Sequence, residues 1–139
     1  MIVKLHGTSG SGKTTVARGL MALAKPEFGV STILSTKNKP EAYMFQLPDV
    51  DLPVFVLGPY INAIGGLDCV SDSADHIRLL HSAAAHGHVF YEGLLGSEYY
   101  GEIGRQSERY GDDHIFAFLD TPVDLCVERV KARRRIRTV

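Results

Sequence analysis

Residues 7–14 read GTSGSGKT, the stretch of the chain that indicates the fold most strongly. It satisfies the pattern G-x-x-x-x-G-K-[ST] in full. The β-branched, apolar run IVKLH at 2–6 precedes it, and helix-forming residues follow it at 14–24. A strand, a glycine-rich loop and a helix in this order form the context in which the pattern binds phosphate.

The glycines let the backbone wrap around a phosphate, so that amide hydrogens and the positive end of the following helix face its oxygens. Lys13 is then expected to bridge the β- and γ-phosphates, and the Thr14 hydroxyl to bind Mg²⁺. The structural alternative is a glycine-rich turn that only joins a strand to a helix, which Lys13 and Thr14 together disfavour. The predicted nucleotide-binding residues are Gly7, Thr8, Ser9, Gly10, Ser11, Gly12, Lys13, Thr14 and Thr15.

Composition limits the class of protein. The 139 residues include 15 Lys and Arg against 16 Asp and Glu, a formal net charge of -1, which disfavours a scaffold that binds nucleic acid mainly through bulk charge. A hydrophobic content of 45% predicts a single domain over residues 1–139. No apolar run is long enough for a membrane span or a secretory signal, so a cytoplasmic protein without a membrane partner is expected. Cys69 and Cys126 suggest neither a disulfide framework nor a zinc cluster.

The rest of the chain alternates between strand and helix patterns, which predicts a three-layer α/β sandwich with a mostly parallel sheet. Besides 2–6, strands are expected at 30–34, 43–47, 54–57, 88–91 and 115–119, and helices at 14–24, 71–86, 97–110 and from Pro122 onward. Strands 43–47 and 54–57 are expected to form an antiparallel pair or two edge strands, and 115–119 to be fully buried.

Two helices show apolar positions that predict their buried faces. In the helix at 71–86 these positions are Ala74, Ile77, Leu80, Ala84 and Ala85. In the last helix they are Val123, Cys126, Val127 and Val130.

Glu92 ends the buried strand at 88–91 and precedes Gly93. Open α/β sheets bind their ligands at the carboxyl ends of the strands, and Glu92 lies beside the phosphate loop if its strand neighbours the first one. It is expected either to accept a proton from an attacking hydroxyl or to order water around Mg²⁺. The structural alternative is a carboxylate that caps the next loop.

The irregular segment 58–68 contains the predicted substrate-binding residues Tyr60, Gly65, Gly66 and Asp68. Tyr60 offers a ring for stacking on a base, and Asp68 a hydrogen-bond acceptor. The structural alternative, a rim aromatic and a turn residue, remains equally open.

Arg129 and Arg133 are four residues apart and share one face of the last helix, where both can meet the phosphates of a nucleotide. With Lys13 and Glu92 they complete the predicted catalytic set. The neighbouring Lys131, Arg135 and Arg137 are better explained as a solvated helix end.

The motifs GTSGSGKTT at 7–15, VFYEG at 89–93 and FLDTPVDLCVERVKARR at 118–134 resemble those of P-loop kinases of the nucleoside and nucleotide kinase lineage. The resemblance implies a P-loop NTPase fold of three α/β/α layers, with ATP and Mg²⁺ as cofactors. It also implies that Arg129 and Arg133 match the lid-proximal arginines, which contact the base and phosphates of ATP.

More narrowly, VFVLGPY followed by GGLD, GHVFYEGLL and LDTPVDLCVERV is similar to the phage 5-hydroxymethyluracil DNA kinase group. That resemblance implies transfer of the ATP γ-phosphate to a hydroxyl on a pyrimidine of phage DNA, in the host cytoplasm. Three alternatives remain open: a deoxynucleoside monophosphate kinase of the thymidylate type, a P-loop ATPase or nucleotide-binding module without a kinase acceptor, and an inactive product that only binds ATP.

Kinases of this lineage continue past the basic helix into a lid, a strand and a closing helix, whereas the sequence here ends at Val139. The expected fold therefore lacks these elements. A minimal kinase, a chain completed by homo-oligomerisation and a fragment of a longer kinase all fit this expectation.

Overall fold

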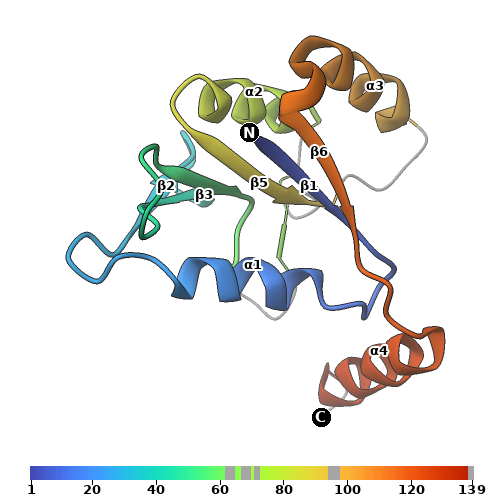
Figure 1. The fold of residues 1–139 in the computed structure, drawn as a ribbon. Coiled ribbons are helices and arrows are strands. Elements are labelled where there is room, and N and C mark those ends of the chain that lie inside the picture. The colour runs from blue at the N-terminus through green and yellow to red at the C-terminus, as the bar shows by residue number, and fades with distance from the viewer. Residues whose placement is uncertain (62–64, 67–69, 71–72, 94–97, 138–139) are drawn as a thin grey trace.

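The computed structural model of the 139-residue chain describes residues 1–61, 65–66, 70, 73–93 and 98–137. Its architecture is α/β, as the alternating pattern predicted, and its elements are drawn in Figure 1. The strands are β1 (Ile2–His6), β2 (Val30–Leu34), β3 (Pro40–Phe45), β4 (Val54–Leu57), β5 (His88–Glu92) and β6 (His114–Phe118). The helices are α1 (Lys13–Ala22), α2 (Ser73–Ala84), α3 (Glu98–Tyr110) and α4 (Val123–Arg137), with a 3-10 turn at Gly111–Asp113.

These strands form one sheet in the order β2-β3-β4-β5-β1-β6. Neighbours from β4 to β6 pair in parallel, whereas β3 runs antiparallel to both β2 and β4. The sheet is therefore mostly parallel, and of the two alternatives predicted for β3 and β4 the antiparallel pair is confirmed.

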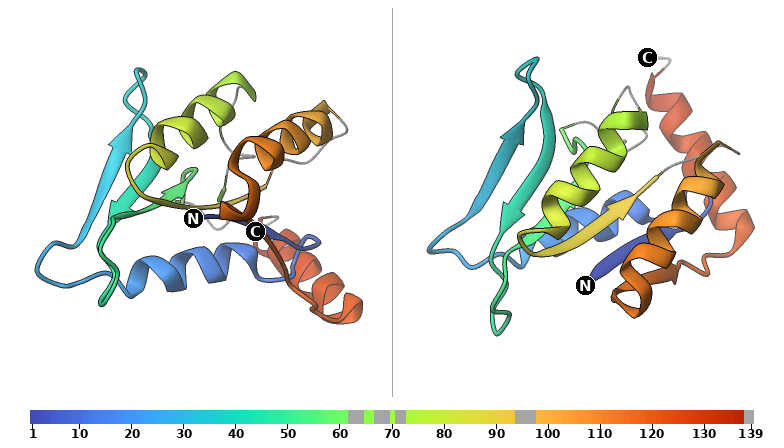
Figure 2. Two further views of the ribbon diagram at one scale, coloured as in Figure 1. Left: turned by 45° about the horizontal axis from the view of Figure 1, so that its top comes forward. Right: turned by 90° about the horizontal axis from the view of Figure 1, so that it is seen from above.

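Helices cover both faces of the sheet. Helices α2 and α3 lie on one side, and α1 and α4 on the other (Figures 1 and 2). Side chains alternate along each strand, so every inner strand supplies both cores. In β4, Val54 and Val56 enter the core with α1, while Phe55 and Leu57 enter the core with α2.

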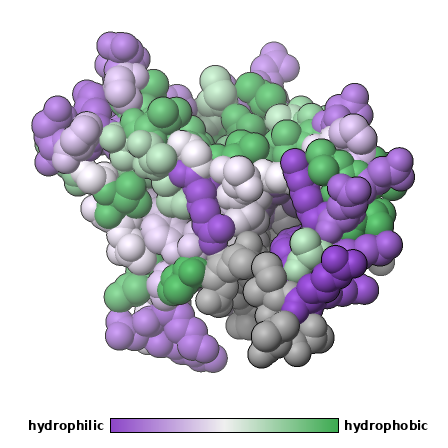
Figure 3. Space-filling model, turned by 90° about the horizontal axis from the view of Figure 1, so that it is seen from below, coloured by the Kyte–Doolittle hydropathy of each residue, from purple (hydrophilic) through white to green (hydrophobic). Residues whose placement is uncertain are grey.

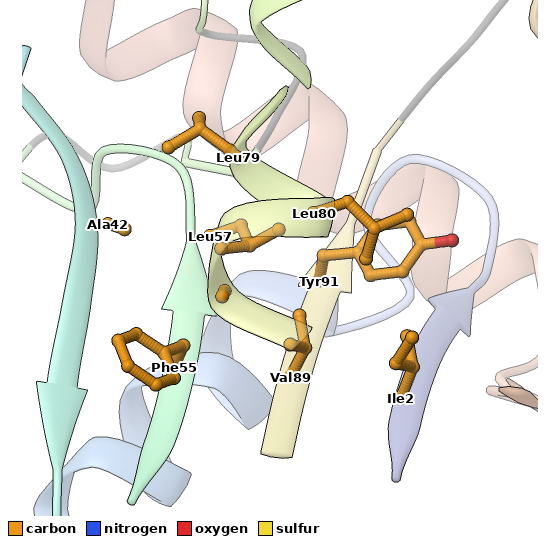
Figure 4. Packing of buried hydrophobic residues seen from close by; sticks show 9 residues of the cluster. Ile2, Ala42, Phe55, Leu57, Leu79, Leu80, Val89 and Tyr91 are labelled. Carbon is orange, nitrogen blue, oxygen red and sulfur yellow. The ribbon is translucent and has the colours of Figure 1, made fainter. Parts of the chain in front are cut away.

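The core on the α2 side illustrates how the layers are held together. Leu79 and Leu80 of α2 lie over Phe55, Val89 and Tyr91 of the sheet (Figure 4). Each fully buried apolar side chain of this size contributes about 1.5–3 kcal/mol to folding.

The predicted buried face of α2 was partly wrong. Leu79 and Ala83 belong to the core together with the predicted Leu80, whereas Ala85 follows the last helical residue and is exposed. Ala74 belongs to the residues whose side chains are not described.

Two predictions about the C-terminal third were also wrong. Strand β6 is not fully buried, because it pairs with β1 alone and forms an edge, leaving Phe118 74% exposed. In α4, Cys126 is buried but Val123 and Val127 are exposed, because this helix contacts the glycine loop along a narrow line instead of packing on the sheet.

The parallel strands position the candidate site. Leu5 of β1 is in register with Glu92 of β5, so the loop that follows β1 and the carboxylate that ends β5 lie at the same edge of the sheet. We call this the carboxyl edge. None of the helices in the described ranges has the length and apolar character needed to cross a membrane.

Candidate active site

The glycine loop connects β1 to the N-terminus of α1. Gly10 and Gly12 have φ values of 83° and 107°, a left-handed conformation that glycine adopts without strain. Gly12 is the N-cap of α1 and provides no side-chain cap, and the Ser11 amide donates to the Thr8 carbonyl at 3.0 Å. The first amides of α1 thus open towards the loop, where an anion benefits from the helix dipole.

Lys13 lies across the mouth of this loop. Its ammonium donates to the carbonyl of Gly7 at 2.6 Å and to that of Thr8 at 3.1 Å. These carbonyls hold the charge where the loop would place a phosphate, and a phosphate oxygen is a stronger acceptor for an ammonium than a neutral carbonyl.

Thr14 and Glu92 join the loop to β5. The Thr14 Oγ1 hydroxyl donates to Glu92 Oε1 at 3.0 Å, and Glu92 is only 2% exposed. Because the hydroxyl hydrogen is directed at the carboxylate, the oxygen lone pairs of Thr14 remain available to a cation.

These residues fit a magnesium ion bound together with a nucleotide. Mg²⁺ prefers oxygen ligands, and in nucleotide sites it uses one or two protein groups plus phosphate oxygens and water. The described residues contain no cluster of three or more His, Cys, Asp or Glu that could hold a metal by themselves. One hydroxyl beside one carboxylate is the donor set expected for this kind of site.

Helix α4 and its preceding turn hold the loop from the outside. Arg129 Nη1 donates to the Gly10 carbonyl at 3.0 Å, and Thr121 Oγ1 donates to the Ser11 carbonyl at 2.8 Å. The Thr8 hydroxyl lies 3.5 Å from Cys126 Sγ. A Cβ on Gly10 would overlap the Cys126 carbonyl oxygen, so the loop and helix touch backbone to backbone.

A pocket of ≈ 620 Å³ opens between the loop, α1 and α4. It brings the predicted Lys13, Thr14, Arg129 and Arg133 together. Figure 3 views the molecule from this side, with hydrophilic side chains gathered at the right over α4. The lining residues are Gly10, Ser11, Gly12, Lys13, Thr14, Thr15, Val16, Arg18, Leu119, Thr121, Arg129, Ala132 and Arg133.

Sequence reasoning missed Thr121, Cys126 as a loop contact, and Arg18. The motif ends before Arg18, whose Nη2 donates to the Tyr60 carbonyl at 3.4 Å. Thr121 directly precedes Pro122, where the sequence predicts the start of the last helix. The sequence did offer one indication of this contact, because a threonine hydroxyl just before a helix can form a hydrogen bond with nearby backbone groups.

Tyr60 does not present its ring to a ligand. It is 8% exposed and packs in the core with α1, its ring centroid 6.1 Å from that of Tyr43. Its amide donates to the Tyr43 hydroxyl at 2.9 Å. A Cβ on Gly65 would overlap the Tyr60 ring, so the Gly65 backbone packs directly against this ring. In this structure the ring of Tyr60 is part of the core and is not exposed for stacking on a base, which corrects the prediction.

Gly66 lies directly against Glu92. Its φ is 97°, and a Cβ there would approach Glu92 Cγ to 2.9 Å and Oε1 to 3.0 Å. The structure therefore brings the predicted acceptor-side glycine next to the predicted catalytic carboxylate. The predicted substrate contact Asp68 lies outside the described residues.

Tyr91 and His114 lie behind the site, on the α3 side of the sheet. The Tyr91 hydroxyl and His114 Nε2 are 3.0 Å apart. Burial raises the pKa of Tyr91 well above its usual range. Burial also lowers the pKa of His114 below 6.5, an effect that a hydrogen bond from the imidazole to the Gln106 backbone opposes and the nearby Lys4 charge reinforces. Both shifts favour the neutral forms of the two side chains.

Comparisons with known proteins give two curated relatives. The chain is 35% identical over 136 residues to the 5-hmdU DNA kinase of Pseudomonas phage PaMx11, covering 96% of this chain and 69% of that protein. It is 29% identical over 141 residues to the 5-hmdU DNA kinase of Pseudomonas phage M6, covering 94% of this chain and 71% of that protein. No family model and no solved structure matches the chain.

Proposed function

This chain belongs to the family of the phage 5-hmdU DNA kinases, and from that premise we propose that it transfers the γ-phosphate of ATP to the hydroxymethyl group of 5-hydroxymethyluracil in phage DNA. The observation that carries the proposal is the hydrogen bond from Thr14 to Glu92. It joins a phosphate-binding loop to a buried carboxylate, the two components that phosphoryl transfer to a hydroxyl needs.

The fold supports the same conclusion. The glycine loop follows β1 and leads into α1, and β5 pairs with β1, which supports the strand, loop and helix order in which the phosphate-binding pattern acts. We infer that Gly7–Thr15 hold the triphosphate of ATP through backbone amides, and that Thr14 contributes the protein ligand to Mg²⁺. The ion, when bound, neutralises phosphate charge.

The proposed reaction has a simple balance. The acceptor oxygen attacks the γ-phosphorus of ATP, the bond from that phosphorus to the β–γ bridging oxygen breaks, and the acceptor proton passes to Glu92. The products are ADP and a phosphomonoester. Lys13 and Arg133 stabilise the charge that spreads over the transferring group. Arg129, already bound to the loop carbonyl of Gly10, keeps the loop in shape beside the phosphates.

The acceptor enters from the side of Gly66. Glu92 ends β5, lies against this glycine and is 2% exposed, so the acceptor hydroxyl has to enter a confined space below the protein surface to meet the carboxylate. A base within a stacked duplex cannot enter such a space, which favours a single-stranded or everted nucleotide as the reacting form. The proposed site of action is the cytoplasm of the phage-infected host.

The test is turnover of γ-labelled ATP with Mg²⁺, in parallel reactions that contain water alone, deoxynucleoside monophosphates, ordinary DNA, or DNA with 5-hydroxymethyluracil. Label on the modified DNA alone is the expected result. Label on a monophosphate would replace the DNA kinase with a nucleotide kinase. Free phosphate at the same rate in every reaction would replace it with an ATPase.

A further inference from the structure

The turn between β2 and β3 lies at the carboxyl edge, on the same side of the sheet as Glu92. Strand β3 is antiparallel to β4, and Ala42 is in register with Leu57 at the end of β4. Leu34 pairs with Pro40 near the turn, so residues 35–39 extend beyond the ends of the parallel strands. The right panel of Figure 2 shows this hairpin pointing in the same direction as the arrowheads of β1 and β5.

This turn is ordered by its own hydrogen bonds. The Ser35 amide donates to the Lys39 carbonyl at 2.8 Å, the Asn38 amide to the Ser35 carbonyl at 2.9 Å, and the Lys39 amide to Ser35 Oγ at 3.3 Å. Asn38 has a φ of 60°, which asparagine tolerates well. Lys37 and Lys39 are exposed, and the folded turn presents both charges at a defined place.

Charge is unevenly distributed over this half of the molecule. The exposed acids Asp49 and Asp51 lie between the end of β3 and the start of β4, at the opposite edge of the sheet, where Asp51 and Lys25 line one pocket. The carboxylate nearest the turn, Glu41, is buried and paired with Arg78 at 3.0 Å. The whole chain has a net charge of -1, whereas the turn at residues 35–39 carries two exposed cations, Lys37 and Lys39, and no acid.

We propose that Lys37 and Lys39 bind backbone phosphates of the acceptor DNA strand and lead that strand along the carboxyl edge to Glu92. This inference rests on the proposed function, since it assigns the DNA backbone of the acceptor to a surface outside the proposed ATP site. Neighbouring strands are about 4.8 Å apart, so β3 lies about 10 Å from β5 along the sheet. A strand of a few nucleotides crosses that span, as in other grooves that track a single strand.

The hairpin and the α4 arginines have different partners. Arg129 and Arg133 line the nucleotide pocket at the other end of the edge, where they serve the phosphates of ATP. Removing the hairpin charges should therefore weaken DNA binding and leave ATP binding intact. An acceptor too short to reach the hairpin should be insensitive to their removal.

The test compares K37Q/K39Q with the matched control K25Q/R109Q, which removes two cations from the opposite edge. Binding of a fluorescein-labelled, unmodified single-stranded 12-mer is followed by anisotropy across a salt series, so the readout does not depend on catalysis. For single strands each lost phosphate contact lowers the slope of log K against log[salt] by about 0.7. We expect K37Q/K39Q to lower this slope by about 1.4, and the control to leave it unchanged.

Kinetics then connect binding to turnover. With modified DNA as acceptor, K37Q/K39Q should raise the KM for DNA while the KM for ATP and the rate with a modified dinucleotide stay at wild-type values. A wild-type salt slope in K37Q/K39Q, or an equal decrease of the slope in the control, overturns the hairpin inference. The proposed function is judged separately, and it is upheld if the wild-type enzyme labels the modified DNA. A wild-type enzyme that labels only monophosphates overturns the proposed function, and the anisotropy result still decides whether the hairpin binds DNA.

Discussion

The Thr14 hydroxyl donates a hydrogen bond to the Glu92 carboxylate at 3.0 Å, although the two residues are 78 positions apart in the chain. Pairing of β1 with β5 makes this contact possible, since it places the end of one strand beside the loop that follows the other. The hydroxyl is thereby oriented towards the carboxylate, which is buried and held against the start of α1. Each partner can be removed separately, which gives distinguishable results.

Glu92→Gln should lower kcat by roughly 10²- to 10⁴-fold, the range typical of lost general base catalysis. The amide oxygen can still accept the Thr14 hydrogen bond, so the loop and the affinity for ATP should be nearly unchanged. Single-turnover transfer and equilibrium ATP binding are the measurements, with the exposed Glu108→Gln as control. Transfer at the wild-type rate in Glu92→Gln would show that Glu92 is not the base.

Thr14→Val should weaken the response to Mg²⁺, since it removes the hydroxyl that we propose as a ligand and keeps the shape of the side chain. The Mg²⁺ concentration for half-maximal rate should rise roughly 10- to 100-fold, the scale of lost support at metal sites. Excess Mg²⁺ should restore part of the rate in this variant and none in Glu92→Gln. The exposed Thr32→Val in β2 provides the control, and an equal shift there would contradict a specific role for Thr14.

Gly10→Ala should destabilise the protein by more than about 1 kcal/mol, because its φ is 83° and its Cβ would overlap the Cys126 backbone. Gly19→Ala is the matched control. Gly19 lies within α1 with no atom within 4 Å of an added Cβ, so alanine there should stabilise by about 0.5–1 kcal/mol. Thermal unfolding of both variants measures the difference. A Gly10→Ala protein as stable as wild type would show that α4 does not press on the loop.

Acid should destabilise the protein through His114. Its pKa is lowered in the folded state by burial, so the unfolded chain binds more protons and stability falls as the pH decreases below 6.5. Between pH 7.5 and 5.5 the Tm of His114→Gln should fall less than that of wild type, while glutamine still offers the Tyr91 hydroxyl a partner. His6, whose pKa is lowered by burial and then by Lys4, should retain part of the effect. The exposed His86→Gln should behave as wild type.

Local sequence patterns predicted much of the architecture. The glycine loop, its flanking strand and helix, and the antiparallel β3–β4 pair all follow from motifs and periodicities that lie within a few residues of each other. The place of Glu92 was conditional on β5 being a neighbour of β1, and the register of Leu5 with Glu92 confirms this condition.

Long-range neighbours account for what the sequence could not predict. An apolar strand such as β6 has the same local pattern at an edge as in the centre, and the order of strands decides its exposure. In the same way, the aromatic Tyr60 is suited both to stacking on a base and to packing beneath Gly65. Contacts of Thr121 and Cys126 with the loop join segments more than 100 residues apart and have no local signature.

The hydrogen bonds between the α4 region and the glycine loop have a consequence for biosynthesis. The loop is translated near the start of the chain, but the Arg129 and Thr121 side chains that hold its carbonyls are made 119 and 110 residues later. Contacts of such high sequence separation form late in folding. A nascent chain that has exposed the complete motif should therefore have a loop without its final shape, and nucleotide affinity should rise only when α4 leaves the ribosome and docks.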